Sequence, residues 1–413
     1  MTSEMTGGTT ASWNFLRSSH PLWMCGLRPF LLLAMGSAIG LLAWWSLVLA
    51  AGMPAPLVAG GALVWHVHEL VFGFAMAAVA GFALTALPEF TGLPSASRAR
   101  LRQLALLWLA ARLGFWLSGL LGLPALWLAA IGQVGFALLL LGELLPALRS
   151  PDGRRHAAFG WLVLALAGTA AGFYADALRG QAGLRWLYAT LGVLMLLIVV
   201  AASRISMRVV NRAIEDLAPG ADAYLARPPR RHLASFAIGL YTAAEWAQQG
   251  SHLCGWLALA AGAAVLNLLN DWHVGAPLWR RRFPLMLYAM YWCMALGYVA
   301  LGLSQLDLLP GGSIAGHHLL AMGAMGLAIF VVCSIAGRAH VGLASDTGPW
   351  LGLGAALLLL ATFWRAGAAL LGADMHQVAF AGVLWCAAYA VLLWRVGPGL
   401  WRPRTDGKTG CAD

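Results

Sequence analysis

The sequence carries little charge and almost no lysine. Only 10% of its 413 residues are charged, and of the 26 Lys and Arg residues just one, Lys408, is a lysine. The arginines are scattered between apolar segments, so they do not form the basic face that nucleic-acid binding requires. We therefore expect no nucleic-acid partner, despite a formal net charge of +10.

The motifs of common soluble chemistries are also missing. The six cysteines stand singly, without a CxxC or CxxCH pair, which excludes a covalently attached c-type haem, a zinc knuckle and a thioredoxin-like pair. There is no phosphate loop, no GxSxG and no HExxH. The polar opening MTSEMTGGTTASWNF lacks the basic start and apolar core of a signal peptide.

Long apolar runs dominate instead. Hydrophobic residues make up 61% of the chain, against about 45–50% in soluble proteins, and a bilayer requires runs of about 20 such residues. The sequence thus predicts an all-α, polytopic integral membrane protein with about twelve transmembrane helices. The expected spans are 27–50, 63–87, 103–121, 123–147, 157–178, 185–203, 232–249, 251–271, 284–305, 314–337, 348–371 and 376–396.

Arginine positions orient these spans. If both termini are cytoplasmic, nearly all loop arginines lie on the cytoplasmic side, and only Arg179 and Arg185 lie in external connections. We therefore predict a cytoplasmic segment 1–26, one membrane domain 27–396 with a cytoplasmic loop at about 204–231, and a cytoplasmic tail 397–413. The bacterial inner membrane is the expected location, with lipid as the surrounding partner.

This topology gathers more than half of the histidines at one depth. His66, His68, His252, His317, His318 and His376 all lie near the external ends of even-numbered spans. At about 1.5 Å of rise per residue, they fall within a turn or two of one another. The other five, His20, His156, His232, His273 and His340, fall on the cytoplasmic side, where loop solvation or headgroup contact accounts for them.

Clustered imidazoles favour a metal or haem centre. Neutral imidazole is the commonest nitrogen ligand for haem iron, copper and zinc. His66 and His68 point about 200° apart on a helix, so they suit two centres on opposite sides rather than one. His317 and His318 point about 100° apart and either straddle a copper or divide between binding and packing. Taken singly, His252 and His376 fit interfacial anchors as well as ligands.

Two charged residues are expected to belong to the same histidine site. Glu69 follows His66 by three residues, on the same helical face, where it would orient that imidazole or relay protons. Arg365, in the external third of its span, would pair with a haem propionate or bond helix carbonyls. Met322 and Met325 follow His318 at helical spacing, which fits packing better than copper ligation.

Several stretches together resemble the NnrS family. They are HPLWMCGLRPFLLLA (His20–Ala34), WHVHELVFGFAMAAVAGFALTALPEFTG (Trp65–Gly92), HLLAMGAMGLAI (His318–Ile329), GRAHVG (Gly337–Gly342) and GPGLWRPR (Gly397–Arg404). The resemblance implies a twelve-span bacterial membrane protein that contains haem and copper and acts in denitrification and nitric oxide stress. The polar positions that match the family are Arg28, His66, His68, Glu69, His318 and His340.

The leading hypothesis is thus a protein with non-covalent, b-type haem and copper that handles nitric oxide near its external face. Reduction of two NO to N₂O is one such chemistry, with electrons from a quinol or a redox protein. The alternatives are a non-enzymatic role in NO sensing or in haem or copper delivery, and a transporter that uses the buried charges Arg112, Glu245 and Arg365.

Overall fold

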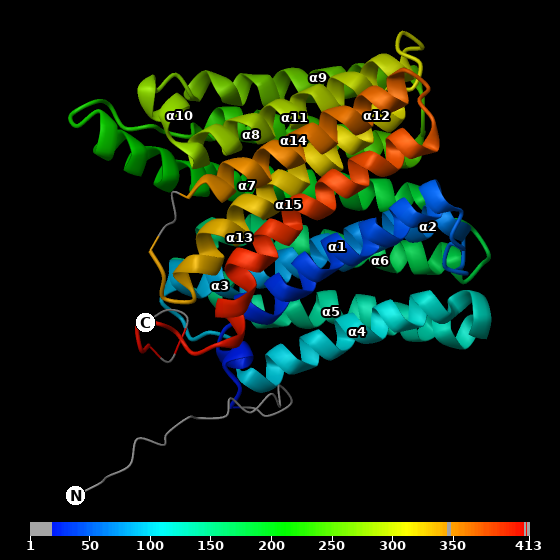
Figure 1. Cartoon of the computed structure of the whole chain (residues 1–413), viewed down its shortest axis with the longest axis horizontal. Helices are drawn as coiled ribbons and strands as arrows, with labels where there is room; N and C mark the ends of the chain where they lie inside the picture. Colours follow the sequence, from blue (N-terminus) through cyan, green and yellow to red (C-terminus); the bar gives the residue numbers. More distant parts are fainter. Residues whose placement is uncertain (1–18, 345–347, 409, 411–413) are drawn as a thin grey trace, which may run out of the picture.

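The computed structural model describes residues 19–344, 348–408 and 410, and these residues form a helical bundle without a strand (Figure 1). The all-α, polytopic membrane architecture is therefore confirmed. Residues 1–18 of the expected N-terminal segment, and 409 and 411–413 of the expected tail, lie outside the described residues. The domain limits and the membrane side of the termini stay predictions.

The helices follow the predicted spans, except that the helix of the sixth span continues to Leu217, into the segment expected as a cytoplasmic loop at about 204–231. They are α1 (Leu27–Ala51), α2 (Gly61–His68), α3 (Met76–Thr91), α4 (Arg98–Leu121), α5 (Leu123–Arg149), α6 (Ala157–Ala177), α7 (Leu184–Leu217), α8 (Pro228–Ala247), α9 (His252–Leu268), α11 (Arg282–Gln305), α12 (Gly312–His318), α13 (Leu327–Ala339), α14 (Pro349–Leu370) and α15 (Met375–Trp401). Two π-helices, η2 (Glu69–Ala75) and η5 (Leu319–Gly326), join α2 to α3 and α12 to α13. Short 3₁₀ segments and α10 (Ala276–Arg280) complete the chain.

Eleven helical stretches among the described residues are long and apolar enough to cross a membrane. The expected span 232–249 corresponds to α8, which is made more polar by Arg230, Arg231 and Glu245. At 20 residues it is long enough to match the hydrocarbon thickness of about 30 Å. It packs against both α7 and α9, so it belongs to the bundle together with the eleven apolar stretches.

The two described ends of the chain meet at one end of the bundle. The fully buried Arg28 guanidinium donates hydrogen bonds to four carbonyl oxygens, those of Pro21, His340, Leu400 and Arg402, at 2.6–3.4 Å. Arg28 therefore ties α1 to the end of α13 and to the end of α15. This meeting of the described ends on one side is what an even number of spans requires.

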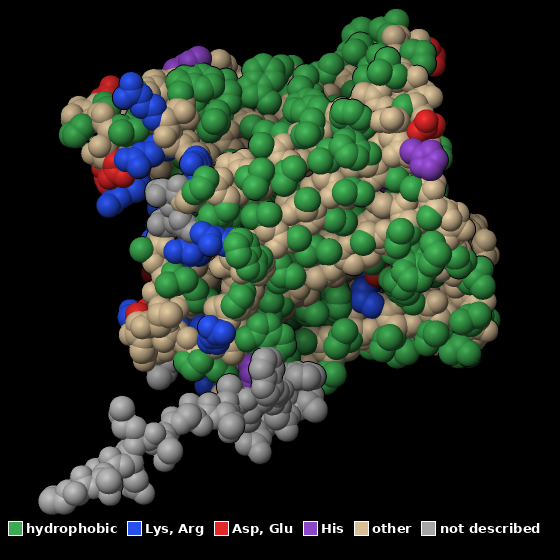
Figure 2. Space-filling model, in the orientation of Figure 1, with side chains coloured by type: hydrophobic (Ala, Val, Ile, Leu, Met, Phe, Trp, Pro, Cys, Tyr) green, Lys and Arg blue, Asp and Glu red, His purple; other side chains and the backbone are tan. Residues whose placement is uncertain are grey.

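The surface separates charge from apolar side chains. In Figure 2 most of the visible Lys and Arg side chains gather at the end of the bundle where the chain termini lie, while hydrophobic side chains cover the flanks. Exposed Leu, Trp and Phe side chains such as Leu106, Trp161, Phe236 and Trp394 lie along these flanks. Such a surface suits lipid, and the basic end suits the cytoplasmic side of a membrane.

Close approach of α4 and α5 depends on two glycines. A Cβ at Gly132 would lie 2.7 Å from the backbone nitrogen of Ala111, and one at Gly114 would lie 2.5 Å from that of Ala129. Small residues at such contacts let membrane helices pack backbone to backbone. On the same helix α5, a Cβ at Gly142 would meet nothing within 4 Å.

This contrast gives a matched pair of variants. Gly132→Ala should lower the free energy of unfolding by about 1–3 kcal/mol, because overpacking forces the backbones apart. Gly142→Ala should raise it by about 0.5–1 kcal/mol, because alanine is the better helix former. Denaturant titration of both variants in detergent measures the difference, and equal effects would contradict the assigned contact.

Candidate functional site

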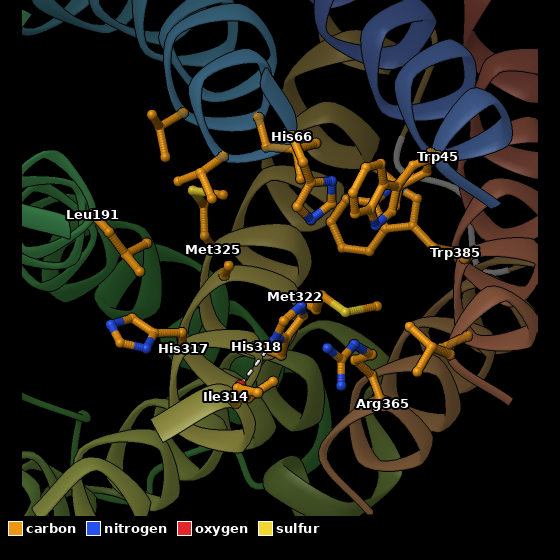
Figure 3. A pocket seen from close by; sticks show the side chains of 18 of the residues that line it. Trp45, His66, Leu191, Ile314, His317, His318, Met322, Met325, Arg365 and Trp385 are labelled. Carbon is orange, nitrogen blue, oxygen red and sulfur yellow. Dashed lines mark hydrogen bonds between the residues drawn. The ribbon is translucent and has the colours of Figure 1, made fainter. Parts of the chain in front are cut away.

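A cavity that is partly open to the surface lies between the helices, near the end away from the arginine loops. Its volume is about 260 Å³, and its walls come from α1, α2, η2, α7, α12, η5, α14 and α15 (Figure 3). Apolar and aromatic side chains form most of the wall. The polar side chains that line it are Ser46, His66, Tyr188, Ser313, His317, His318 and Arg365. We call this space the histidine cavity.

Two histidines point into the histidine cavity from different helices. In Figure 3 the rings of His66, from α2, and His318, from α12, both face the space beside Arg365. His318 Nδ1 donates to the carbonyl oxygen of Ile314 at 2.8 Å. That bond fixes the ring and its tautomer and leaves Nε2 as a lone-pair donor, the usual arrangement of a metal-binding histidine.

His66 is held differently. Its ring stacks on the indole of Trp45, with centroids 4.6 Å apart and planes at 19°. Within the described part of the chain it makes no hydrogen bond. An imidazole on the wall of an apolar cavity without a polar partner leaves a donor and an acceptor unused, whereas most buried polar groups have a hydrogen-bond partner.

His317 turns to another side of the cavity. Figure 3 shows it beside Leu191, away from His66 and Arg365. Its Nδ1 donates to the carbonyl oxygen of Ser313 at 2.8 Å, and its ring stacks on Tyr188 at 4.4 Å. The predicted divergence of His317 and His318 is therefore present, and they do not straddle one point.

Arg365 reaches into the histidine cavity from α14. Its guanidinium lies near His318 and Met322 in Figure 3. No described residue offers it a hydrogen bond or an ion pair. An unpaired cation inside a membrane-spanning helix is costly, so it is expected to meet an anionic group of a ligand.

Both histidine-bearing helices change winding directly after their histidines. The π-helix η2 begins at Glu69 and η5 begins at Leu319. Each helix starts from a glycine in the left-handed region, Gly60 at φ 86° and Gly311 at φ 74°. The wide turns of a π-helix expose backbone carbonyls. Side chains from other helices bind two of these carbonyls: Trp108 Nε1 donates to the carbonyl oxygen of Gly73, and the Tyr389 hydroxyl donates to that of Gly326. Such π-helical turns often mark functional sites.

His68 faces away from the histidine cavity, as the helical period predicts. Its Nδ1 donates to Glu69 Oε1 at 2.9 Å, and the Tyr174 hydroxyl donates to its Nε2 at 2.9 Å. The ring stacks on Phe115 at 3.6 Å and is fully buried. With both nitrogens engaged and aromatic rings around it, His68 has no free lone pair for a metal in this structure.

Glu69 does not contact His66, contrary to the expectation from α-helical spacing. Its backbone is still α-helical, with its N–H bonded to the carbonyl oxygen of Trp65, but its carboxylate turns towards His68. Its other partner is Arg112 Nη1, at 3.3 Å. Arg112 in turn donates to Gln133 Oε1 at 2.6 Å. Glu69 is 2% exposed and does not line the histidine cavity.

The remaining predicted residues lie elsewhere. Arg28 bonds carbonyl oxygens at the arginine-rich end, and His340 lies at that same end, with Nε2 3.1 Å from Glu89 Oε1. His252 and His376 are exposed at the opposite end, where His252 Nε2 lies 3.2 Å from Asp307 Oδ2. None of these four lines the histidine cavity. Their roles as ligands stay predictions that these positions do not favour.

Copper lacks a recognisable site in this structure. Among the described residues, no group of three or more His, Cys, Asp or Glu side chains is placed to hold a metal ion. Copper sites typically combine several imidazole or sulfur ligands. The expectation of bound copper therefore stays a prediction, and the described residues do not assign it a set of ligands.

Sequence reasoning did not find the aromatic partners. Trp45 and Tyr188 hold His66 and His317 by stacking, and Tyr174 holds His68. No motif marks them, because they come from helices distant in sequence.

Comparison with known proteins gives a family-level result. A family model described as NnrS protein matches residues 21–404, nearly the whole chain. A search among curated proteins found no match. The matched range contains the entire histidine cavity and the buried network around His68.

Proposed function

Because the chain belongs to the NnrS family, as its resemblance predicted, we propose that it is a haem protein of the bacterial cytoplasmic membrane that binds nitric oxide in the histidine cavity. The observation that carries the proposal is the convergence of His66 and His318 on one apolar cavity, beside the unpaired Arg365. Imidazole is a common ligand of haem iron, and guanidinium is a natural partner of a propionate carboxylate.

The residues present fit haem by their chemistry. His318 would be the firmly oriented ligand, because its Nδ1 proton is already held by the Ile314 carbonyl. His66 would be the second and more easily displaced ligand, since it lacks a hydrogen bond that fixes it. Trp45, Phe74 and Trp385 supply the flat apolar walls that a porphyrin needs. When bound, haem supplies an iron that coordinates NO.

Binding is better supported than turnover. Reduction of two NO to N₂O consumes two protons, and no aspartate or glutamate is among the described residues that line the histidine cavity. Glu69, the expected proton carrier, is instead engaged by His68 and Arg112. We therefore propose that the protein captures or senses NO rather than reducing it.

An NO electrode distinguishes these roles. Addition of NO to the reduced, haem-loaded protein should give rapid uptake of about one NO per haem and then stop, even with a quinol or a redox-protein donor present. The uptake should disappear after haem is removed. Continued consumption together with N₂O formation would contradict the binding role and establish a reductase.

Arg365 gives a separate prediction. Arg365→Met should weaken haem binding by about 10- to 100-fold, because a charge-assisted hydrogen bond contributes about 1.5–3 kcal/mol. Arg365→Lys should recover much of the loss by restoring the charge. Haem titration of the haem-free protein measures both, and Arg179→Met, an exposed change at the same end of the bundle, controls for net charge. Equal affinity in Arg365→Met and wild type would exclude the propionate role.

A further inference from the structure

A second cavity adjoins the first and is partly open at the surface of the bundle. Its volume is about 70 Å³, and its walls come from α1, η2, α3, α7, α11, η5 and α13. No charged, amide or hydroxyl-bearing side chain lines it. Small residues make the space, among them Ala75, Ala78, Ala201 and Ala202. A cavity with such walls stays dry and accepts apolar atoms such as xenon.

The two cavities share one wall residue, Met325 in η5. They also follow one another along a single helical stretch, because Val71 and Phe74 line the first while Ala75 and Ala78 line the second. Figure 3 shows Met325 at the edge of the histidine cavity, on the side of His66. A methionine is unbranched and flexible, so it separates two spaces without sealing them rigidly.

The far side of the second cavity approaches the surface of the bundle. Phe82, Ile205, Ile329 and Val332 line it and are only half-buried. In a membrane, this part of the surface meets acyl chains rather than water. Its walls offer nothing to an ion or to water.

We propose that the second cavity is a dry docking chamber for an apolar diatomic gas, which enters from the lipid and passes Met325 to the histidine cavity. This inference rests on the proposed function, because it gives that site its route of supply. Nitric oxide is uncharged and dissolves in hydrocarbon, so it fits both the lipid and the chamber. On this route the gas meets only apolar side chains in the second cavity, and it meets polar side chains first in the histidine cavity, where it is bound.

Filling the chamber tests this route. Ala201→Leu on α7 and Ala78→Leu on α3 would fill it from two walls without touching a residue of the histidine cavity. Ala130→Leu is the matched control, because Ala130 and Ala201 are both 8% exposed and Ala130 lines neither cavity. Flash photolysis of the ferrous carbonyl form, with carbon monoxide as the photolabile gas, measures rebinding in the purified haem-loaded protein.

Rebinding should slow by about tenfold in both chamber variants, corresponding to about 1.4 kcal/mol of barrier. The equilibrium affinity and the haem spectrum should not change, because a route alters on- and off-rates alike. The Ala130→Leu variant should rebind at the wild-type rate. Wild-type rebinding in both chamber variants would overturn the route while leaving the haem assignment intact.

Xenon-129 NMR tests the chamber without haem. The xenon-129 signal should show exchange between free xenon and xenon bound to the wild-type protein. This exchange should be weaker for Ala201→Leu than for Ala130→Leu. A purified protein that cannot bind haem would contradict the proposed function, and xenon would still decide whether the chamber takes an apolar gas. Equal xenon exchange in all variants would overturn the chamber itself.

Discussion

A His318→Ala variant should reach the membrane and lose nearly all of its haem. His318 is the imidazole whose Nδ1 donates to a backbone carbonyl and whose Nε2 is left for a metal. Changing even the outer partner of a metal ligand costs about 10- to 100-fold in affinity, so loss of the ligand itself should exceed that range. The ratio of haem to purified protein, measured by the pyridine haemochrome spectrum, gives the result.

Two further histidine variants sharpen this prediction. His376→Ala should keep full haem content, because His376 is exposed at the same end of the bundle and lines no part of the histidine cavity. His66→Ala should keep more haem than His318→Ala, because His66 has only the Trp45 ring to orient it. Full haem content in His318→Ala would exclude it as the oriented ligand.

An Arg112→Leu variant should lose about 3–5 kcal/mol of stability, the cost of leaving a buried charge without its partner. Glu69 is 2% exposed, and Arg112 Nη1 at 3.3 Å is the cation beside it. Replacing both residues, as Glu69→Gln with Arg112→Leu, should recover part of the loss because no uncompensated carboxylate remains. Denaturant titration in detergent measures each free energy of unfolding.

Another arginine of α4 provides the control. Arg100 lies 3.2 Å from Glu143, but its side chain is 50% exposed. Exposed pairs contribute about 0–1 kcal/mol, so Arg100→Leu should have little effect. Equal losses from Arg100→Leu and Arg112→Leu would show that the buried network does not stabilise the bundle more than a surface pair does.

The helical membrane fold could be predicted from the sequence because each span is indicated by many apolar residues together rather than by one motif. Runs of about 20 apolar residues satisfy a bilayer independently of neighbouring helices, so span positions are readable from hydropathy. The weakest signal is that of α8, where Arg230, Arg231 and Glu245 reduce the apolar character, although its apolar run still predicted a span at 232–249. Its place in the bundle is fixed by tertiary contacts that hydropathy does not encode.

The site was predictable only in part. Helical geometry correctly placed His66 and His68 on different sides, because the residues between them still wind as an α-helix. The expected contact of Glu69 with His66 is absent, because the Glu69 side chain turns instead to His68 and Arg112. Grouping six histidines by depth likewise could not tell the cavity-lining His318 from the exposed His376. Depth gives a residue's height in the membrane, and packing decides which way it faces.

The absorption spectrum of the purified protein, with iron quantified and repeated after NO addition to the reduced form, tests the central claim most directly. We predict about one equivalent of non-covalently bound haem and a spectral shift that saturates at about one NO per haem. The His318→Ala variant should show neither band nor shift. A purified, folded wild-type protein that binds no haem, or whose haem spectrum is unchanged by NO, would contradict the account.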